Sequence, residues 1–352
     1  MKEVDYIIVG LGLAGIAFCE ELEKHRKSFV VFDGGRPGAS RVSGGIYNPV
    51  ILKRYTLPWK AEESMELVPT YYAGLSKKLG RKIHKPLPVL RIFSSVEDQN
   101  NWFTASAKQG LSHFMEDGIL RENRTGVSAP YHVGKVKGTG WVNVPLLLDL
   151  YRSYLVEKKL FFSEEFQHDK IDIEDGFVFY KNVRARFIVF TEGYGMKNNP
   201  YFNKLPLVGN KGEYIIIKAE KLEDNAAVKS NFFIIPLGQN LYKVGATFNW
   251  KEKDTVPTET AREEILATLN KVLTCDFEVM GQEAGIRPTT GDRRPLLGSH
   301  PRYPNLVLFN GLGTRGIMMS PYLACILYEH LEQGKELLDK VNIMRFPKKM
   351  KI

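Results

Sequence analysis

Apolar and polar positions follow two periods along this chain, and the first is clearest at the amino end. An almost continuous apolar run at residues 4–9 leads into a glycine-rich turn, then an amphipathic stretch at 14–24, then the apolar run 29–32. Short continuous apolar runs are typical of buried parallel strands, and a period near 3.6 is typical of a helix. The order strand, turn, helix, strand predicts an α/β nucleotide-binding unit.

The turn reads Gly10-Leu11-Gly12-Leu13-Ala14-Gly15, a GxGxxG between a strand and a helix. Gly10 permits the sharp bend, Gly12 lets a pyrophosphate approach the backbone, and Gly15 lets the helix pack on the strand. The helix amino end favours phosphate. Asp33 ends the second strand and suits a ribose diol, which argues against the 2′-phosphate of NADP. The motif leaves NAD and FAD as alternatives.

The same periods predict the other elements of the chain. The stretch 34–46 is too rich in glycine and small residues for a regular element, and suits a backbone lying along an extended cofactor or a surface loop. From Gly212 the period becomes two, which predicts a sheet. Helices are expected at 57–79, 96–108, 144–156, 258–273 and 317–331. Strands are expected at 89–93, 131–136, 161–162, 177–179, 186–190, 213–218, 232–235, 242–247, 277–287 and 305–310.

A second strand, glycine turn and helix follow near the carboxyl end. The strand 305–310 precedes Gly311-Leu312-Gly313-Thr314-Arg315-Gly316, and the helix after it ends at Gly334. Packing explains the apolar helix positions but not three glycines beside an arginine. A further glycine turn at residues 191–195, after another buried strand, predicts a second contact with a dinucleotide.

Composition changes this interpretation little. The 352 residues, 43% hydrophobic and 25% charged, suit two joined domains of a soluble enzyme. No apolar run is long enough to cross a bilayer and no signal peptide precedes the first strand, so a cytoplasmic protein is expected. Cys19, Cys275 and Cys325 form no CxxC and are expected to be structural thiols, and the seven histidines show no metal spacing, so no metal is predicted. A net charge of +9 fits nucleic acid or small anions, with a solvated surface as the simpler explanation.

Nearly the whole chain resembles the FAD-dependent D-amino-acid oxidase superfamily, which includes glycine and sarcosine oxidases. The matching segments are 10–15 with Asp33, 38–46, 211–213, 235–236 with 244–247, 285–288 and 311–321. Residues 287–295 and 311–316 are most similar to the oxidoreductase half of the bifunctional enzyme that makes methylaminomethyl-thiouridine in tRNA. The methyltransferase half of that enzyme has no counterpart here.

The resemblance implies a Rossmann-like α/β FAD-binding domain of the glutathione-reductase type and a substrate domain built on a mainly antiparallel sheet. The FAD domain is expected at 1–57, 135–205 and 284–352, and the substrate domain at 58–134 and 206–283. FAD is expected to be non-covalent, because Thr289 and Thr290 follow Arg287 where relatives carry a cysteine. The implied cofactor residues are Gly10, Gly12, Leu13, Ala14, Gly15, Asp33, Gly34, Ser40, Arg41, Ser43, Gly44, Gly45, Thr191, Gly193, Gly313, Thr314, Arg315, Gly316 and Ile317.

The implied chemistry is hydride transfer from the carbon beside an amine to flavin N5, giving an imine that water hydrolyses. Arg287 matches the carboxylate-binding arginine of the family, with a sheet-end salt bridge as the alternative. Arg315 is expected to be a second anion contact or to serve the N1–C2=O edge of the flavin. Phe233 and Tyr242 are candidate pocket walls, and core packing is as good an explanation for either. Glu192 stands where relatives carry a small residue.

Two functions follow. The favoured hypothesis is an oxidase or dehydrogenase acting on a small amine or amino acid such as an N-substituted glycine. The alternative is a tRNA-modifying enzyme that removes a carboxymethyl group from a wobble uridine, since that substrate is also an N-substituted glycine. A flavoprotein scaffold without catalysis would leave the arginines unexplained.

Overall fold

The computed structural model describes residues 1–36, 38–120 and 125–350 and divides into two compact units. Unit 1 comprises Met1–Arg41, Val144–Asn210 and Ile286–Ile352, and unit 2 comprises Val42–Asn143 and Lys211–Gly285. The chain thus changes units at residues 41, 143, 210 and 285. The sequence-based boundaries lie at 57, 134, 205 and 283, so the first two differ most.

The main sheet of unit 1 is largely parallel. Its described strands run in the order β17 (Leu296–Ser299), β18 (Leu306–Asn310), β11 (Val183–Phe190), β1 (Lys2–Val9), β2 (Phe29–Phe32) and β8 (Phe161–Phe162), with β10 (Phe177–Tyr180) and β9 (Ile171–Glu174) added beside β11. β1 pairs in parallel with both β11 and β2. The carboxyl ends of these three strands therefore lie at one edge, where nucleotide sites form in open α/β sheets.

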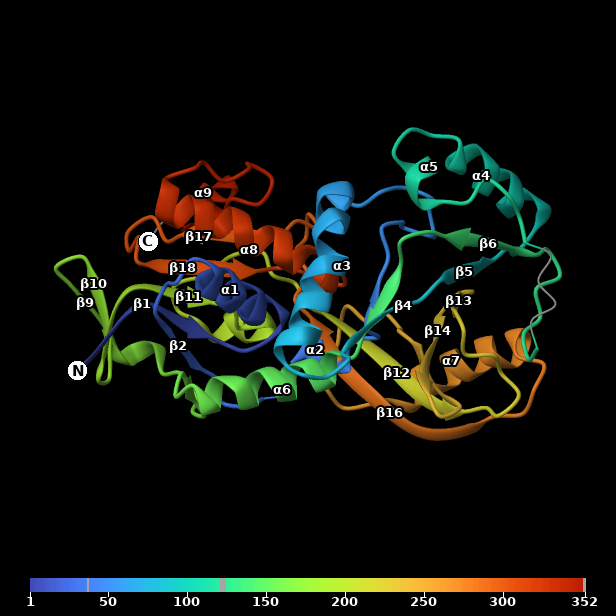
Figure 1. Cartoon of the computed structure of the whole chain (residues 1–352), viewed down its shortest axis with the longest axis horizontal. Coiled ribbons are helices and arrows are strands. Elements are labelled where there is room, and N and C mark those ends of the chain that lie inside the picture. Colours follow the sequence, from blue (N-terminus) through green and yellow to red (C-terminus); the bar gives the residue numbers. More distant parts are fainter. Residues whose placement is uncertain (37, 121–124, 351–352) are drawn as a thin grey trace. The chain divides into compact units, whose positions relative to one another are not determined.

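Both faces of β1 are covered, which explains its continuous apolar run. Ile7 and Val9 belong to one core cluster. Tyr6, on the opposite face, packs edge-on against Phe18 of α1 (Leu13–Lys24), with ring centroids 5.6 Å apart. α1 and α8 (Gly316–Gln333) pack side by side in unit 1 (Figure 1). The two helices that follow the predicted glycine turns are therefore neighbours.

The main sheet of unit 2 is mostly antiparallel. Its described strands run in the order β16 (Glu278–Arg287), β12 (Asn210–Lys218), β15 (Leu241–Gly245), β14 (Phe233–Gly238), β13 (Ala227–Lys229), β5 (Val89–Ile92) and β6 (Val133–Val136). β13 and β5 form a parallel pair. A small second sheet joins β3 (Ile46–Tyr47), β7 (Gly140–Val142) and β4 (His84–Pro86).

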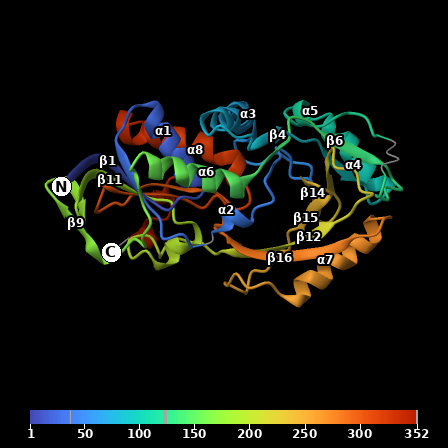
Figure 2. The ribbon, with the colours of Figure 1, turned by 60° about the horizontal axis from the view of Figure 1, so that its bottom comes forward.

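Helix α7 (Glu259–Val272) covers one face of the large sheet of unit 2 (Figure 2). On this face Ile265 and Leu269 join Tyr242 and Val244 in a core cluster. Thr258 caps this helix by accepting a hydrogen bond from Ala261 N, as predicted. Because side chains alternate along a strand, Phe233 lies on the other face.

The remaining helices include two that differ from the sequence-based prediction. They are α2 (Ala39–Val42), α3 (Ala61–Lys78), α4 (Val96–Ser106), α5 (Leu111–Phe114), α6 (Val144–Glu157) and α9 (Pro347–Met350), with 3-10 turns at His168–Lys170, Gly193–Asn198 and Ile343–Arg345. α2 lies in the stretch expected to have no regular element. α3 begins after Lys60, which has φ +55, and not near Pro58. Within the described part of the chain, no helix is both long and apolar enough to cross a bilayer.

Candidate cofactor and substrate site

The first glycine turn is held by contacts that exclude side chains. Gly10 has φ +96, and a Cβ atom on Gly15 would lie 2.2 Å from the Gly10 carbonyl oxygen. Thr191, at the end of β11, donates its hydroxyl to that same oxygen at 2.6 Å. Thr191 therefore supports the glycine turn directly, and its predicted contact with a dinucleotide stays a prediction.

The first turn of α1 is available to an anion. Gly12 is its N-cap, makes no side-chain cap, and is followed by a first turn without acidic residues. Ser40 in α2 accepts a hydrogen bond from Leu13 N at 3.3 Å, and its oxygen lies 3.2 Å from where a Gly12 Cβ would be. A phosphate at this helix end would meet main-chain N–H groups and a hydroxyl.

Asp33 is held at the end of β2 by two main-chain donors. Its Oδ2 accepts from Leu11 N and its Oδ1 from Gly35 N, both at 2.6 Å. A carboxylate has about four lone-pair positions, so two remain for ribose hydroxyls. Arg41, also predicted as a cofactor residue, forms an ion pair with Asp149 of α6, and that hydrogen bond raises its pKa.

The second glycine turn adjoins the first within unit 1. Gly311 and Gly313 have φ +76 and +54, and a Cβ on Gly316 would lie 3.3 Å from Leu13 Cδ1. Arg315 is the N-cap residue of α8, and burial lowers its pKa to about 10. The guanidinium therefore remains charged at neutral pH beside the start of two helices.

Arg287 ends β16 and is 9% exposed. It donates from Nη1 to Asn210 Oδ1 at 2.6 Å, while Asn210 Nδ2 is buried without a hydrogen-bond partner among the described residues. Pro288 O accepts from Gly313 N at 3.1 Å. The arginine is thus tied through its neighbouring residue to the second glycine turn.

Residues 43–45 belong to unit 2 and form a tight corner there. Gly45 has φ +80, and a Cβ on it would lie 2.4 Å from Val142 O. A Cβ on Gly44 would lie 2.7 Å from Ile235 Cδ1 and 3.3 Å from the Tyr214 hydroxyl. The hydroxyl of Ser43 is buried with no hydrogen-bond partner in the described part of the structure.

The predicted pocket residues Phe233 and Tyr242 occupy opposite faces of the same sheet. Phe233 pairs with Gly245, which in turn pairs with Tyr214, so Tyr214 and Phe233 flank a position without a side chain. Tyr242 lies in the core cluster against α7, and its hydroxyl donates to Leu222 O. This placement favours core packing for Tyr242 and leaves Phe233 as the candidate pocket wall.

The remaining predicted residues are placed as follows. Leu13, Ala14 and Ile317 are buried at the starts of α1 and α8, whereas Gly34 and Thr314 are exposed. Glu192, the departure from the family, binds His168 Nε2 and Asn199 Nδ2, both at 2.8 Å. Gly193, with φ +56, follows it, and its carbonyl accepts from Asn310 Nδ2.

A model of the family described as FAD dependent oxidoreductase matches residues 5–329 of this chain. The chain belongs to this family. It is 20% identical to the glycine oxidase of Bacillus subtilis over 99% of this chain and 98% of that protein. It is also 27% identical to the glycine oxidase of Pseudomonas aeruginosa over 38% of this chain, a match that spans 37% of that protein.

Two further comparisons bear on fold and function. A match with the tRNA 5-methylaminomethyl-2-thiouridine biosynthesis bifunctional protein MnmC of Idiomarina loihiensis has 26% identity over 41% of this chain and 25% of that protein. The solved structure of glycine oxidase from Geobacillus kaustophilus superposes with a TM-score of 0.76 at 20% identity and covers 96% of each chain. The predicted α/β fold with a Rossmann-like unit is thereby confirmed.

The residues present fit FAD, the cofactor of this family. Within unit 1, the α1 amino end without an acid and the Asp33 carboxylate supply donors and acceptors that a dinucleotide requires. Sequence reasoning missed Tyr214, Ile235 and Asn210. Alternation from Glu213 would have predicted the face of Tyr214, but which face adjoins residue 44 depends on long-range packing.

Proposed function

We propose that this FAD-dependent oxidoreductase oxidises the C–N bond of an amino acid or an N-substituted glycine, with Arg287 binding the substrate carboxylate. The observation that carries the proposal is the hydrogen bond from Gly313 N to Pro288 O, which links Arg287 to the turn that begins α8. A buried guanidinium at such a place is suited to orient one C–H bond, because its fork matches a carboxylate in two hydrogen bonds.

In this proposal the side chains of the protein orient the substrate and balance the charge that develops during the reaction. Bound FAD supplies a two-electron acceptor for the hydride, and water then hydrolyses the imine product. Arg287, fixed by Asn210, binds the carboxylate, and Phe233 beside Gly245 limits the space for the side chain. Arg315, a cation with little access to water, offsets negative charge that grows during reduction. An amine that arrives neutral needs no general base from the protein.

The test is a substrate panel without oxygen. Purified protein with FAD is mixed with glycine, sarcosine, iminodiacetate and several D- and L-amino acids, and the flavin absorbance is followed. If one class of amino acid bleaches the flavin and the corresponding amine without the carboxylate does not, the proposal is supported. Protein that binds FAD and is bleached by none of these compounds contradicts it.

A second candidate is modification of a tRNA wobble uridine by removal of a carboxymethyl group. The partial similarity to the bifunctional tRNA enzyme and the net charge of +9 favour it. Its reacting group is an N-substituted glycine, so Arg287 would play the same part. Two observations together would support this candidate. The protein binds tRNA with an affinity that weakens as salt is added, and it then releases the carboxymethyl group from the bound tRNA. We favour a small substrate and a cytoplasmic location.

A further inference from the structure

A pocket of about 470 Å³ lies in unit 2 where α3 ends and the chain turns toward β4. Four of its lining residues are basic: Lys77, Arg81, Lys82 and His84. Ser76 adds a hydroxyl, and Ala73 and Gly80 complete the lining. None of the residues proposed above for FAD or for the carboxylate lines this pocket.

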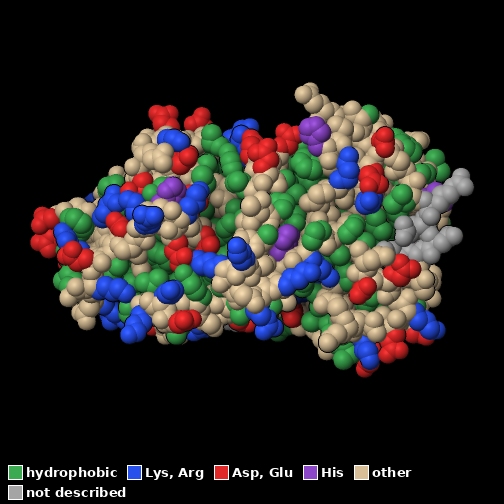
Figure 3. Space-filling view, in the orientation of Figure 1, with side chains coloured by type: hydrophobic (Ala, Val, Ile, Leu, Met, Phe, Trp, Pro, Cys, Tyr) green, Lys and Arg blue, Asp and Glu red, His purple; other side chains and the backbone are tan. Residues whose placement is uncertain are grey.

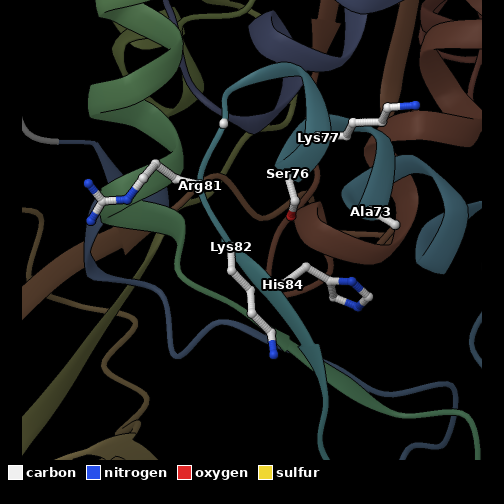
Figure 4. A pocket seen from close by; sticks show the side chains of 7 residues that line it. Ala73, Ser76, Lys77, Arg81, Lys82 and His84 are labelled. Carbon is white, nitrogen blue, oxygen red and sulfur yellow. The ribbon is translucent and has the colours of Figure 1, made fainter.

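The basic side chains that line the pocket point in different directions. In Figure 4, Ser76, Lys82 and His84 lie at its centre, while Arg81 and Lys77 extend to opposite sides. Lys77, Arg81 and Lys82 are exposed, and His84 is half-buried. On the face drawn in Figure 3, blue basic side chains form separate groups interrupted by red acidic ones. The basic side chains on that face therefore do not form one continuous band.

Capping of α3 does not account for these cations. Basic residues in a last helical turn commonly compensate the open carbonyl groups there. Here the backbone closes that end itself, because Leu75 O, Lys77 O and Ser76 O accept from the N–H groups of Leu79, Gly80 and Arg81. Gly80, with φ +65, permits this turn. The side chains of Lys77, Arg81 and Lys82 are left for another purpose.

Acidic residues are absent from the lining. Among the described residues, no carboxylate forms an ion pair with Lys77, Arg81 or Lys82. The acids in the first turn of α3, Glu62 and Glu63, lie at the opposite end of this 18-residue helix. An anion bound at this pocket would meet positive charge that no carboxylate of the lining offsets, which favours its binding.

His84 adds a group that would report such an anion. Its Nε2 shares a hydrogen bond of 2.8 Å with the Tyr47 hydroxyl, and its ring lies near Tyr72 of α3. Burial and the charge of Lys82 lower its pKa. An anion bound between Lys82 and His84 would counter the second of these effects.

We propose that this pocket binds a phosphate group, supplied by an RNA backbone or by a phosphorylated small molecule. Phosphate presents several acceptor oxygens and up to two charges, so it can use more than one of the lining cations, whereas a carboxylate has two oxygens. The carboxyl end of the α3 dipole disfavours anions, so affinity must come from the side-chain charges. Binding should therefore depend steeply on salt.

The experiment uses the full-length, FAD-loaded protein after removal of free FAD. Binding of fluorescent single-stranded RNA, of tRNA and of the small probes ADP and inorganic phosphate is measured between 50 and 300 mM salt, roughly the range over which counterion release is resolved. The variant is Arg81→Ala/Lys82→Ala. The charge-matched control is Lys218→Ala/Arg262→Ala, because both cations are partly or fully exposed in unit 2 and pair with Glu220 and Glu259.

Two results support the proposal and identify the source. If RNA is the ligand, the Arg81/Lys82 variant binds RNA more weakly and the slope of log affinity against log salt falls by about 1 to 2, while the control changes it less. If a small molecule is the ligand, ADP or phosphate raises the NMR-measured pKa of His84, assigned with His84→Gln, in wild type and not in the variant. Binding that is absent, or equal in variant and control, overturns the proposal. Substrate bleaching is measured on the same samples, so failure here is separable from failure of the proposed oxidation.

Discussion

Three cationic side chains of this protein are partly or largely buried, and burial affects each of them differently. Arg287 is 9% exposed and is oriented by the Asn210 amide. Arg315 keeps its charge although burial lowers its pKa. For Lys229, burial first and the nearby Arg91 second lower the pKa to about 7. The first two lie at the proposed active centre, and the third on the substrate sheet beside Phe233.

Removal of the Arg287 guanidinium should abolish most substrate selection. We expect Arg287→Met to lower kcat/KM by roughly 30-fold to several thousand-fold, because loss of one partner of a buried charge pair costs about 2–5 kcal/mol. Arg287→Lys keeps the charge without the planar fork, so its kcat/KM should lie between that of wild type and that of Arg287→Met. Steady-state kinetics with the carboxylate substrate and its decarboxylated amine measure the effect.

FAD binding provides the control for this prediction. Both variants should bind FAD with an unchanged absorbance spectrum, and activity on the decarboxylated amine should change little. Equal losses on both substrates would assign Arg287 to folding or to the cofactor and not to the carboxylate.

Lys229 should make stability depend on pH. Its folded pKa lies near 7 against 10.5 for the ordinary group, so the folded state is penalised below about pH 7 and the penalty fades as pH rises toward 10.5. We expect Lys229→Met to be more stable than wild type at pH 6, with the difference in unfolding free energy shrinking by pH 9.5. Urea unfolding at both pH values measures it. Lys218→Met, exposed on β12, should show no such trend.

At the scale of elements, the threonine that caps α7 also contacts the sheet on which the helix packs. Thr258 caps the helix, and its hydroxyl also donates to Glu213 Oε1 at 2.9 Å. Glu213 is 2% exposed and lies near the ammonium of Lys211. The cap therefore also satisfies a buried carboxylate.

Thr258→Ala should cost about 2 kcal/mol of unfolding free energy, since it removes an N-cap and one hydrogen bond to a buried charge. Chemical denaturation of FAD-loaded protein measures this, and Thr258→Ser should restore most of it. A loss below about 0.5 kcal/mol would mean that Glu213 is satisfied without this hydroxyl.

Strongly periodic elements were predictable from local sequence, and short ones were not. β1 and β2 are continuous apolar runs, and α1, α6 and α8 each bury a face whose period appears in the sequence. β4, β7 and β13 have three residues each, and each pairs with a strand that is distant in the sequence. The site follows the same rule: the glycine turns were visible, whereas the side of the sheet occupied by Tyr242 depended on a register that no local pattern contains.

For the whole molecule, the proposed FAD residues come from both units. Residues 10–15, Asp33 and the turn at 311–316 belong to unit 1, and Ser43, Gly44 and Gly45 belong to unit 2. A ligand that binds only the folded state stabilises every part that contributes to its site, by about 2.7 kcal/mol at a hundred times its Kd. FAD should therefore protect each segment that supplies residues to its proposed site.

We expect FAD to slow hydrogen exchange at residues 10–16 and at residues 43–47 of the same sample. Ser43→Ala should weaken FAD binding about fivefold, the equivalent of one hydrogen bond of ~1 kcal/mol, because it removes the buried hydroxyl that is proposed to bond the cofactor. Ser153→Ala serves as control, because Ser153 is exposed on α6 and its hydroxyl donates to the Asp149 carbonyl oxygen. Protection confined to residues 10–16, with Ser43→Ala binding FAD as tightly as wild type, would restrict the cofactor to unit 1 and remove residues 43–45 from its site.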